Sequence, residues 1–350
     1  MRGCAPVSKT PLLAVEDLAV EFATYGGRVK AVRGVSFSVD AGQTLAIVGE
    51  SGCGKSVTVQ TVMGLIPIPP GHITGGSARL RGREILGRPI LDGKDIRGDQ
   101  IGMIFQDPMT SLNPTMNIGS QIAETLQVHR GQTYKQAFAR AVELLEMVRI
   151  PEAERRAKQY PFEFSGGMLQ RAMIATAIAC EPAVLIADEP TTALDVTIQA
   201  QILDLMMELQ RSKDMAIILI THDLGVVARM ADEVAVMYAG QIVEKGSVDD
   251  VFYRSSHPYT LGLRAAMPSN DREHGHRLHP IDGSPPDLFH PPVGCGYCAR
   301  CPHAMRVCAE QPPATHAINT SGSHYSRCFL HHPDARDKRV PGIHYPEAGA

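Results

Sequence analysis

The stretch Gly49-Glu50-Ser51-Gly52-Cys53-Gly54-Lys55-Ser56 follows directly on an apolar run over residues 45–48. It matches the pattern G-x-x-x-x-G-K-[ST], in which a glycine-rich turn joins a buried strand to a helix. The glycines let successive backbone N–H groups turn inward around phosphate groups, and a helix beginning near Lys55 adds its positive N-terminal end. We therefore predict a triphosphate site in which Lys55 bridges the β- and γ-phosphates and the Ser56 hydroxyl ligates Mg²⁺. The residues expected to contact the nucleotide here are Gly49, Ser51, Gly52, Cys53, Gly54, Lys55, Ser56 and Val57.

A second apolar run, over residues 183–187, ends in two carboxylates, Asp188 and Glu189. Phosphoryl transfer needs little covalent help from a protein, but it needs a positioned water and neutralised charge. We expect Asp188 to lie near the magnesium ion and Glu189 beside the attacking water. Alone, such a run could be a simple strand-to-loop transition, but the phosphate loop elsewhere in the chain favours the catalytic interpretation.

The remaining hydrophobic pattern predicts an α/β fold. Short runs rich in Val, Ile and Leu cover residues 101–105, 216–220 and 234–237, which is typical of a largely parallel sheet covered on both faces. Residues 15–39 alternate around a Gly26-Gly27 turn, so we predict an antiparallel hairpin beside that sheet. From residue 107 the pattern becomes helical, and residues 135–150 carry one apolar stripe.

The bulk composition narrows the function classes. The chain has 350 residues, 44% hydrophobic and 20% charged, with a formal net charge of −3. This composition is that of a folded protein, and it provides no global basic surface for nucleic acid. No apolar run approaches the roughly 20 residues that span a bilayer, and the N-terminus carries no secretory signal. We expect a cytosolic protein that reaches the membrane through a partner.

In this order along the chain, the motifs resemble those of the ABC ATPase family. Phe164-Ser165-Gly166-Gly167-Met168 is similar to the family's signature motif, L-S-G-G-Q, and differs from it at the first and last positions. The resemblance implies that Ser165, Gly166 and Gly167 contact the γ-phosphate of ATP held by an opposite subunit. Hydrolysis then requires two chains.

Four further positions take their expected roles from this resemblance. Gln106 resembles the family's Q-loop glutamine, which touches Mg²⁺ or the attacking water and reports the nucleotide state to the membrane partner. Asp195, in Ala193-Leu194-Asp195, resembles the D-loop aspartate at the dimer seam. His222 resembles the switch histidine, which holds the γ-phosphate and Glu189 in reactive geometry, although a lone histidine after a strand is more often structural. Tyr25 is a candidate to stack on adenine, but Phe22 lies nearby and either ring could belong to the core.

Three classes of ABC ATPase compete for this sequence: transport subunits, soluble proteins that act on DNA or ribosomes, and redox proteins with a borrowed ATPase domain. Members that act on DNA insert a long coiled coil between the Q-loop and the signature motif. Gln106 and Ser165 are only 59 positions apart, and the chain has a single phosphate loop. The transport class is therefore favoured.

Local sequence narrows the resemblance to the peptide/nickel importer subfamily. Three segments carry it: Ile66-Pro67-Ile68-Pro69-Pro70-Gly71, Phe105-Gln106-Asp107-Pro108-Met109 and His257-Pro258-Tyr259-Thr260. The resemblance implies two related ATPase subunits beneath two transmembrane permease subunits, fed by an extracytoplasmic substrate-binding protein. It also implies a place at the cytoplasmic face of the inner membrane. The expected cargo is a di- or oligopeptide, with nickel or another small solute as the alternative.

Five of the eight cysteines lie in the last fifth of the chain. Four thiolates on a loop-rich tail suit either an iron–sulfur cluster or tetrahedral zinc, and free thiols remain a third reading. Cys298 complicates the choice because Cys295, Cys298 and Cys301 open a ferredoxin-like C-x₂-C-x₂-C run, but the next cysteine comes too late for that pattern. In the same subfamily some members bind a [4Fe–4S] cluster, and the resemblance implies the ligands Cys295, Cys301, Cys308 and Cys328.

These expectations combine into one architecture. We predict a RecA-like P-loop ATPase core with an antiparallel β flank over residues 10–260. Within it, a helical subdomain spans about residues 107–180. A Cys-rich C-terminal extension follows over residues 261–335, and a tail over residues 336–350 ends the chain.

Overall fold

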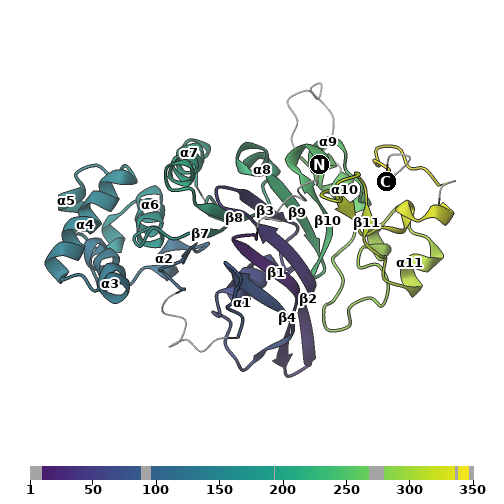
Figure 1. Ribbon diagram of the computed structural model, residues 1–350, viewed down its shortest axis with the longest axis horizontal. Helices are drawn as coiled ribbons and strands as arrows, with labels where there is room; N and C mark the ends of the chain where they lie inside the picture. The colour runs from purple at the N-terminus through teal and green to yellow at the C-terminus, as the bar shows by residue number, and fades with distance from the viewer. Residues whose placement is uncertain (1–9, 88–95, 193, 268–279, 336–337, 347–350) are drawn as a thin grey trace, which may run out of the picture.

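A computed structural model describes residues 10–87, 96–192, 194–267, 280–335 and 338–346. The molecule is elongated, with a helical region at one end, two β-sheets in the middle and the C-terminal part of the chain at the other end (Figure 1). Ala193, in the expected D-loop, lies outside the described residues, as do residues 336–337 and 347–350 of the expected tail.

The larger sheet has eight strands in the order β11-β12-β10-β9-β3-β8-β7-β6. Five neighbouring strands of this sheet run parallel: β9, β3, β8, β7 and β6. They confirm the five apolar strands predicted from the sequence. Their bounds are β3 Thr44–Val48, β6 Ile101–Ile104, β7 Val184–Asp188, β8 Ala216–Thr221 and β9 Glu233–Tyr238. β6 ends one residue before the predicted end, and the ring of Phe105 is exposed. Strands β10 (Gln241–Ser247), β12 (Tyr325–Ser326) and β11 (His316–Ala317) extend the sheet antiparallel.

The smaller sheet is antiparallel, with the order β2-β1-β4-β5. The predicted hairpin is confirmed as β1 (Leu13–Thr24) and β2 (Gly27–Val39), but its turn is Tyr25-Gly26, because Gly27 already pairs with Thr24. β4 (Gly71–Leu80) and β5 (Arg83–Glu84) complete this sheet. Helix α1 (Lys55–Val62) begins where the sequence predicts it, and Val59 and Val62 join one core with both sheets.

The helical region confirms the change of pattern after residue 107. It contains α2 (Pro108–Ser111), α3 (Ile118–Arg130), α4 (Tyr134–Met147), α5 (Ala153–Arg156), η1 (Pro161–Glu163) and α6 (Gly166–Ala177). α4 begins at a capping box, in which Thr133 and Gln136 satisfy each other's backbone N–H groups. The predicted apolar stripe is buried at Ala137, Ala141, Leu144, Leu145 and Val148.

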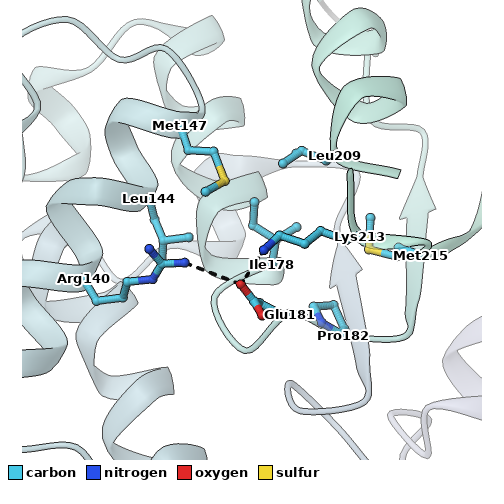
Figure 2. A pocket seen from close by; sticks show the side chains of 9 residues that line it. All are labelled: Arg140, Leu144, Met147, Ile178, Glu181, Pro182, Leu209, Lys213 and Met215. Carbon is cyan, nitrogen blue, oxygen red and sulfur yellow. Dashed lines mark hydrogen bonds and ion pairs between the residues drawn. The ribbon is translucent and has the colours of Figure 1, made fainter. Parts of the chain in front are cut away.

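A small crevice lies between α4, the segment that follows α6, and α7 (Val196–Lys213). The Glu181 carboxylate lies across it, 2.6 Å from Lys213 Nζ and 3.6 Å from Arg140 Nη2 (Figure 2). The crevice is otherwise largely apolar and is lined by Leu144, Met147, Ile178, Pro182, Leu209 and Met215. It holds none of the candidate nucleotide-binding residues.

The C-terminal part of the chain packs on the end of the larger sheet with little regular structure. After α8 (Leu224–Met230), α9 (Val248–Tyr253) and α10 (Pro258–Ala265), the described residues hold η2 (Cys298–Arg300), α11 (Arg306–Glu310), η3 (Phe329–His331) and η4 (Pro333–Ala335). Buried Glu244 ties this part together, because its carboxylate accepts from the N–H groups of Ser256 and His257 and lies 3.0 Å from His324 Nε2. Among the described residues, none of the helices is both long and apolar enough to cross a bilayer.

Candidate active site

The candidate catalytic residues gather at one edge of the larger sheet. Strands β3, β8, β7 and β6 are neighbours in that order and run parallel. The carboxyl ends of parallel strands meet at the same edge, where open α/β sheets bind ligands. The phosphate loop follows β3, His222 follows β8 and Glu189 follows β7. Gln106 is the second residue after β6.

The phosphate loop has the backbone shape that the glycine pattern predicts. Gly49 and Gly54 have φ values of 155° and 103°, and a Cβ on Gly54 would collide with the carbonyl oxygen of Ala31. Lys55 is buried, and its Nζ donates to the carbonyl oxygens of Gly49 (2.8 Å) and Glu50 (2.9 Å). Ser51 and Gly52 at the tip are exposed, so the turn that would hold phosphate is open to a ligand.

Cys53 is the side chain of the loop that turns inward. It is 6% exposed, and burial raises the pKa of its thiol, so it is a neutral filler under the loop at neutral pH. Val57, in the first turn of α1, packs partly buried against the core between the two sheets. These two side chains shape the loop from below, and their contact with a nucleotide stays a prediction.

Ser56 and Asp188 form the first contact between the two sequence motifs. The Ser56 hydroxyl donates to Asp188 Oδ1 at 2.9 Å. Asp188 is 3% exposed, and burial raises the pKa of its carboxyl group, against the lowering effect of the Ser56 hydrogen bond. A hydroxyl and a carboxylate are hard oxygen donors of the kind that Mg²⁺ selects, so this pair fits that ion in chemistry.

Glu189 is the point where three strand ends converge. Its carboxylate accepts from Gln106 Nε2 at 3.0 Å and lies 3.2 Å from His222 Nδ1. Its backbone is in the left-handed region (φ 49°), and its N–H donates to the carbonyl of Ile220 on the neighbouring strand. The structure thus brings Gln106, Glu189 and His222 together from β6, β7 and β8.

Thr192 belongs to this cluster and was missed from the sequence. Its hydroxyl donates to Glu189 Oε2 at 2.9 Å. A hydroxyl three residues after a candidate catalytic carboxylate is a weak signal in sequence, because many turns place threonine there to bond to backbone instead. The contact depends on the left-handed turn at Glu189, which the sequence pattern does not reveal.

The remaining predicted nucleotide contacts lie on other elements. Ser165 caps α6 by accepting from the Met168 N–H, and Ser165 and Gly166 are exposed. Helix α6 lies in the helical region, well apart from α1 (Figure 1). Asp195 caps α7 through the Ile198 N–H (2.9 Å), and Tyr25 is fully exposed at the β1–β2 turn.

The five C-terminal cysteines line one small cavity, together with His257, Tyr297 and Leu330 among others. Burial raises the pKa of Cys295 to about 11 and that of Cys328 to about 12, so both are protonated at neutral pH. Over the described ranges, no three His, Cys, Asp or Glu side chains are arranged to hold a metal ion. The donor set suits a thiolate-bound metal in kind, but it does not stand in ligating geometry.

Fold and site together define a class: a P-loop ATPase whose candidate catalytic carboxylate, Glu189, lies at the carboxyl edge of a parallel sheet. Comparison with known proteins agrees with this class. The ABC transporter family matches residues 32–192, and the family "oligopeptide/dipeptide transporter, C-terminal region" matches residues 243–308.

Curated relatives match almost the whole chain. The oligopeptide transport ATP-binding protein OppD of Bacillus subtilis is 55% identical over 97% of this chain and 93% of its own length. The dipeptide transport ATP-binding protein DppD of the same organism is 53% identical over 91% and 94%. The chain belongs to the ABC transporter ATPases, in the group of oligopeptide and dipeptide transport ATP-binding proteins.

Solved structures show the same fold. A dimeric ATP-binding cassette in a post-hydrolysis state, bound to ADP and Pi, has a TM-score of 0.61 at 25% identity and covers 67% of this chain and 98% of its own. cbiO1 from Clostridium perfringens, described as part of an ABC transporter complex, has a TM-score of 0.58 at 27% identity, with coverages of 70% and 91%. The chain is therefore an ATP hydrolase with the cassette fold that its sequence predicts.

Proposed function

We propose that this chain is the ATP-hydrolysing subunit of an importer of di- and oligopeptides. The observation that carries the proposal is the convergence of Gln106, His222 and Thr192 on Glu189, beside the Ser56–Asp188 pair. This is a poised water-activating carboxylate next to a phosphate loop. The names of the relatives, oligopeptide and dipeptide transport ATP-binding proteins, support the peptide cargo.

In this proposal the chain's residues position ATP and a water molecule. The N–H groups of the 49–54 turn and the Lys55 ammonium hold the phosphates. Glu189 orients and polarises the attacking water, and His222 holds the carboxylate and the γ-phosphate in line. Ser56, Asp188 and Gln106 would hold Mg²⁺, which supplies neutralisation of the phosphate charge when it is bound.

We propose that two ATPase subunits share each nucleotide. The turn of Ser165, Gly166 and Gly167 caps the γ-phosphate held by the partner, and Asp195 crosses the seam between the subunits. Tyr25 stacks on the adenine of its own site. The exposure of Ser165, Gly166 and Asp195 and the separation of α6 from α1 support a role toward a second chain, and one of the similar structures is itself a dimer.

The same proposal places the chain on the cytoplasmic face of the cell membrane, beneath two permease subunits that a substrate-binding protein supplies. Exposed apolar side chains beside Gln106 and before the signature turn support a docking face: Phe105, Met109 and Phe162. We assign residues 10–260 to the ATPase domain and 261–335 to the transporter-specific region. The second ATPase subunit is expected to be a related chain.

The four cysteines Cys295, Cys301, Cys308 and Cys328 are proposed to hold a [4Fe–4S] cluster, with zinc as the alternative. Their position around one cavity supports the proposal, and Cys298 is the spare thiol. Such a group would supply structural stability, since ATP hydrolysis needs no electron transfer. Anaerobic purification followed by iron, sulfide and zinc analysis tests it: Cys308→Ser should lose the bound metal, whereas Cys298→Ser should keep it. Metal-free wild-type protein would end this assignment.

The function is tested by co-expression with candidate permeases and uptake of labelled peptides into proteoliposomes that contain ATP. Peptide accumulation that depends on ATP supports the proposal, and the Lys55→Ala variant should abolish it. Accumulation of nickel or another solute without peptide would reassign the cargo. Failure of every candidate permease pair to give ATP-dependent uptake of any solute would contradict the transport role.

A further inference from the structure

The C-terminal part of the chain contacts the phosphate loop at Glu50. Arg300 Nη1 lies 2.5 Å from Glu50 Oε2, and Arg300 Nη2 donates to Glu50 Oε1 at 2.9 Å. Such a paired guanidinium–carboxylate contact fixes orientation as well as distance, because two parallel bonds must form at once. The two residues are 250 positions apart.

Arg300 is itself held firmly. Its side chain is 5% exposed, its Nε donates to the carbonyl of Asp282 at 2.9 Å, and its Nη2 donates to that of Ile281 at 3.1 Å. Its Nη1 also donates to the Tyr238 hydroxyl at 3.2 Å. A buried arginine with this many partners is held in one position, unlike a mobile charge on the surface.

Glu50 connects Arg300 to the atoms that are expected to bind phosphate. Its carbonyl accepts from Lys55 Nζ at 2.9 Å, and its N–H donates to the Tyr259 hydroxyl at 2.9 Å. The Tyr259 ring packs against Tyr238 and Tyr297, with centroids 4.5 and 5.3 Å away. Side chain, N–H and carbonyl of Glu50 are therefore all engaged, so a shift of Arg300 moves the start of the loop.

We propose that Arg300 is a positioning residue for ATP binding, which acts through Glu50 to hold the phosphate loop in its open shape. The proposal rests on the assignment of this loop to phosphate. It makes the segment between Cys298 and Cys301, outside the matched cassette, a part of the nucleotide site of the same chain. It goes beyond the motifs, because Glu50 occupies a position that the phosphate-loop pattern leaves free.

The test compares Glu50→Gln, Arg300→Lys and Arg300→Gln, and the double variant Glu50→Gln/Arg300→Gln, in the full chain. Glu50→Gln keeps the size of a half-buried side chain and is the variant most certain to fold. The matched control is Arg306→Gln, which breaks an arginine–glutamate pair at 2.7 Å on the surface of the same region, with Arg306 93% exposed. The measurements are KM and kcat for MgATP, the Tm without nucleotide, and hydrogen exchange of the amides of residues 49–54.

We expect KM to rise roughly tenfold in Glu50→Gln and in Arg300→Gln, because each removes a charged hydrogen-bonded pair from the loop. Arg300→Lys should fall between wild type and Arg300→Gln, since an ammonium keeps the charge but loses the fork. The double variant should be no worse than either single variant, because both remove one shared interaction. Exchange at residues 49–54 should quicken in all of these variants and not in Arg306→Gln.

An unchanged KM and unchanged exchange in Glu50→Gln would overturn the proposal. So would a lower Tm with KM unaffected, which marks a purely structural pair, or single effects that add in the double variant. If the wild type itself neither binds nor hydrolyses ATP, the proposed function fails instead. If the wild type is active and Glu50→Gln has the same KM and the same exchange, the proposed function stands and only the role of Arg300 is removed.

Discussion

The carboxyl edge of the larger sheet and the C-terminal lobe (residues 280–335) are built on opposite plans. At the sheet edge Gln106, Glu189 and His222 each follow a strand within two positions, so the order of the strands brings them to the site. In the lobe, short turns and single-turn helices carry the important side chains, and contacts such as Arg300 with Glu50 join residues far apart in sequence. Backbone hydrogen bonding organises the first region, and side-chain hydrogen bonding organises the second.

The comparison teaches where a substitution is felt. At the sheet edge the backbone frame does not depend on the functional side chains, so their loss should change chemistry and leave the fold intact. In the lobe the buried polar side chains themselves hold the fold together through hydrogen bonds, so their loss should lower the free energy of unfolding first. The following predictions test this division.

The largest effect is expected for Glu189→Gln. The amide cannot accept a proton or polarise water as the carboxylate does, so kcat should fall by about 10²- to 10⁴-fold. Nucleotide affinity and Tm should stay close to wild type, because β7 and its ladder are untouched. Steady-state hydrolysis and equilibrium binding of a fluorescent nucleotide measure the two. Glu208→Gln, at an exposed pair with Arg149, is the control, and hydrolysis retained in Glu189→Gln would contradict the assignment.

A stability effect is expected for Glu244→Gln, on β10 beside the C-terminal lobe, because its carboxylate contacts His324 of the lobe. The glutamine can present only one oxygen where the carboxylate presents two to the N–H groups of Ser256 and His257. The free energy of unfolding should fall by roughly 1–3 kcal/mol, as for other buried groups left without a partner. Urea unfolding measures it, with Glu233→Gln on the paired strand as the more exposed control. Equal loss in both variants would remove the distinction between the two regions.

A smaller effect is expected for Thr192→Val, which removes the hydroxyl and keeps the shape. One hydrogen bond to Glu189 is lost, so kcat should fall by about 3- to 10-fold while the Tm is unchanged. Thr191→Val, at the adjacent buried threonine, separates this from local packing. A lower Tm with an unchanged kcat in Thr192→Val would show that Thr192 stabilises the fold and does not act in the site.

The smallest effect is expected for Glu181→Gln at the crevice in Figure 2. Hydrogen bonding to Lys213 lowers the pKa of this carboxyl group, so its contribution is present above the pKa of the unfolded chain and is lost as pH falls through the folded value. The carboxylate is half-exposed, so solvent screens the pair. The loss of unfolding free energy at pH 7 should be below about 1 kcal/mol. A loss of several kcal/mol would mean that this crevice is a structural anchor of the helical region.

Much of the fold and site could be predicted because their signals are local. The five apolar runs became β3, β6, β7, β8 and β9, and the stripe at residues 135–150 became the buried face of α4. Differences in these elements were confined to their ends: the hairpin turn moved by one residue, and β6 ended at Ile104 rather than Phe105. Thr192 was missed, and so was the use of Tyr259, whose segment was known from the sequence as a marker of the subfamily alone.

The sequence by itself determined the ATPase class. A glycine-rich turn between a buried strand and a helix is typical of a phosphate-binding loop, and the ends of parallel strands bring their residues to a common edge. Only the tertiary structure decided which distant groups hold those residues in place. Three features depend on how irregular loops pack: the paired contact of Arg300 with Glu50, the hydrogen bond to the Tyr259 hydroxyl, and the cysteines around one cavity. Side-chain contacts between residues 250 positions apart leave no periodic pattern in a single sequence.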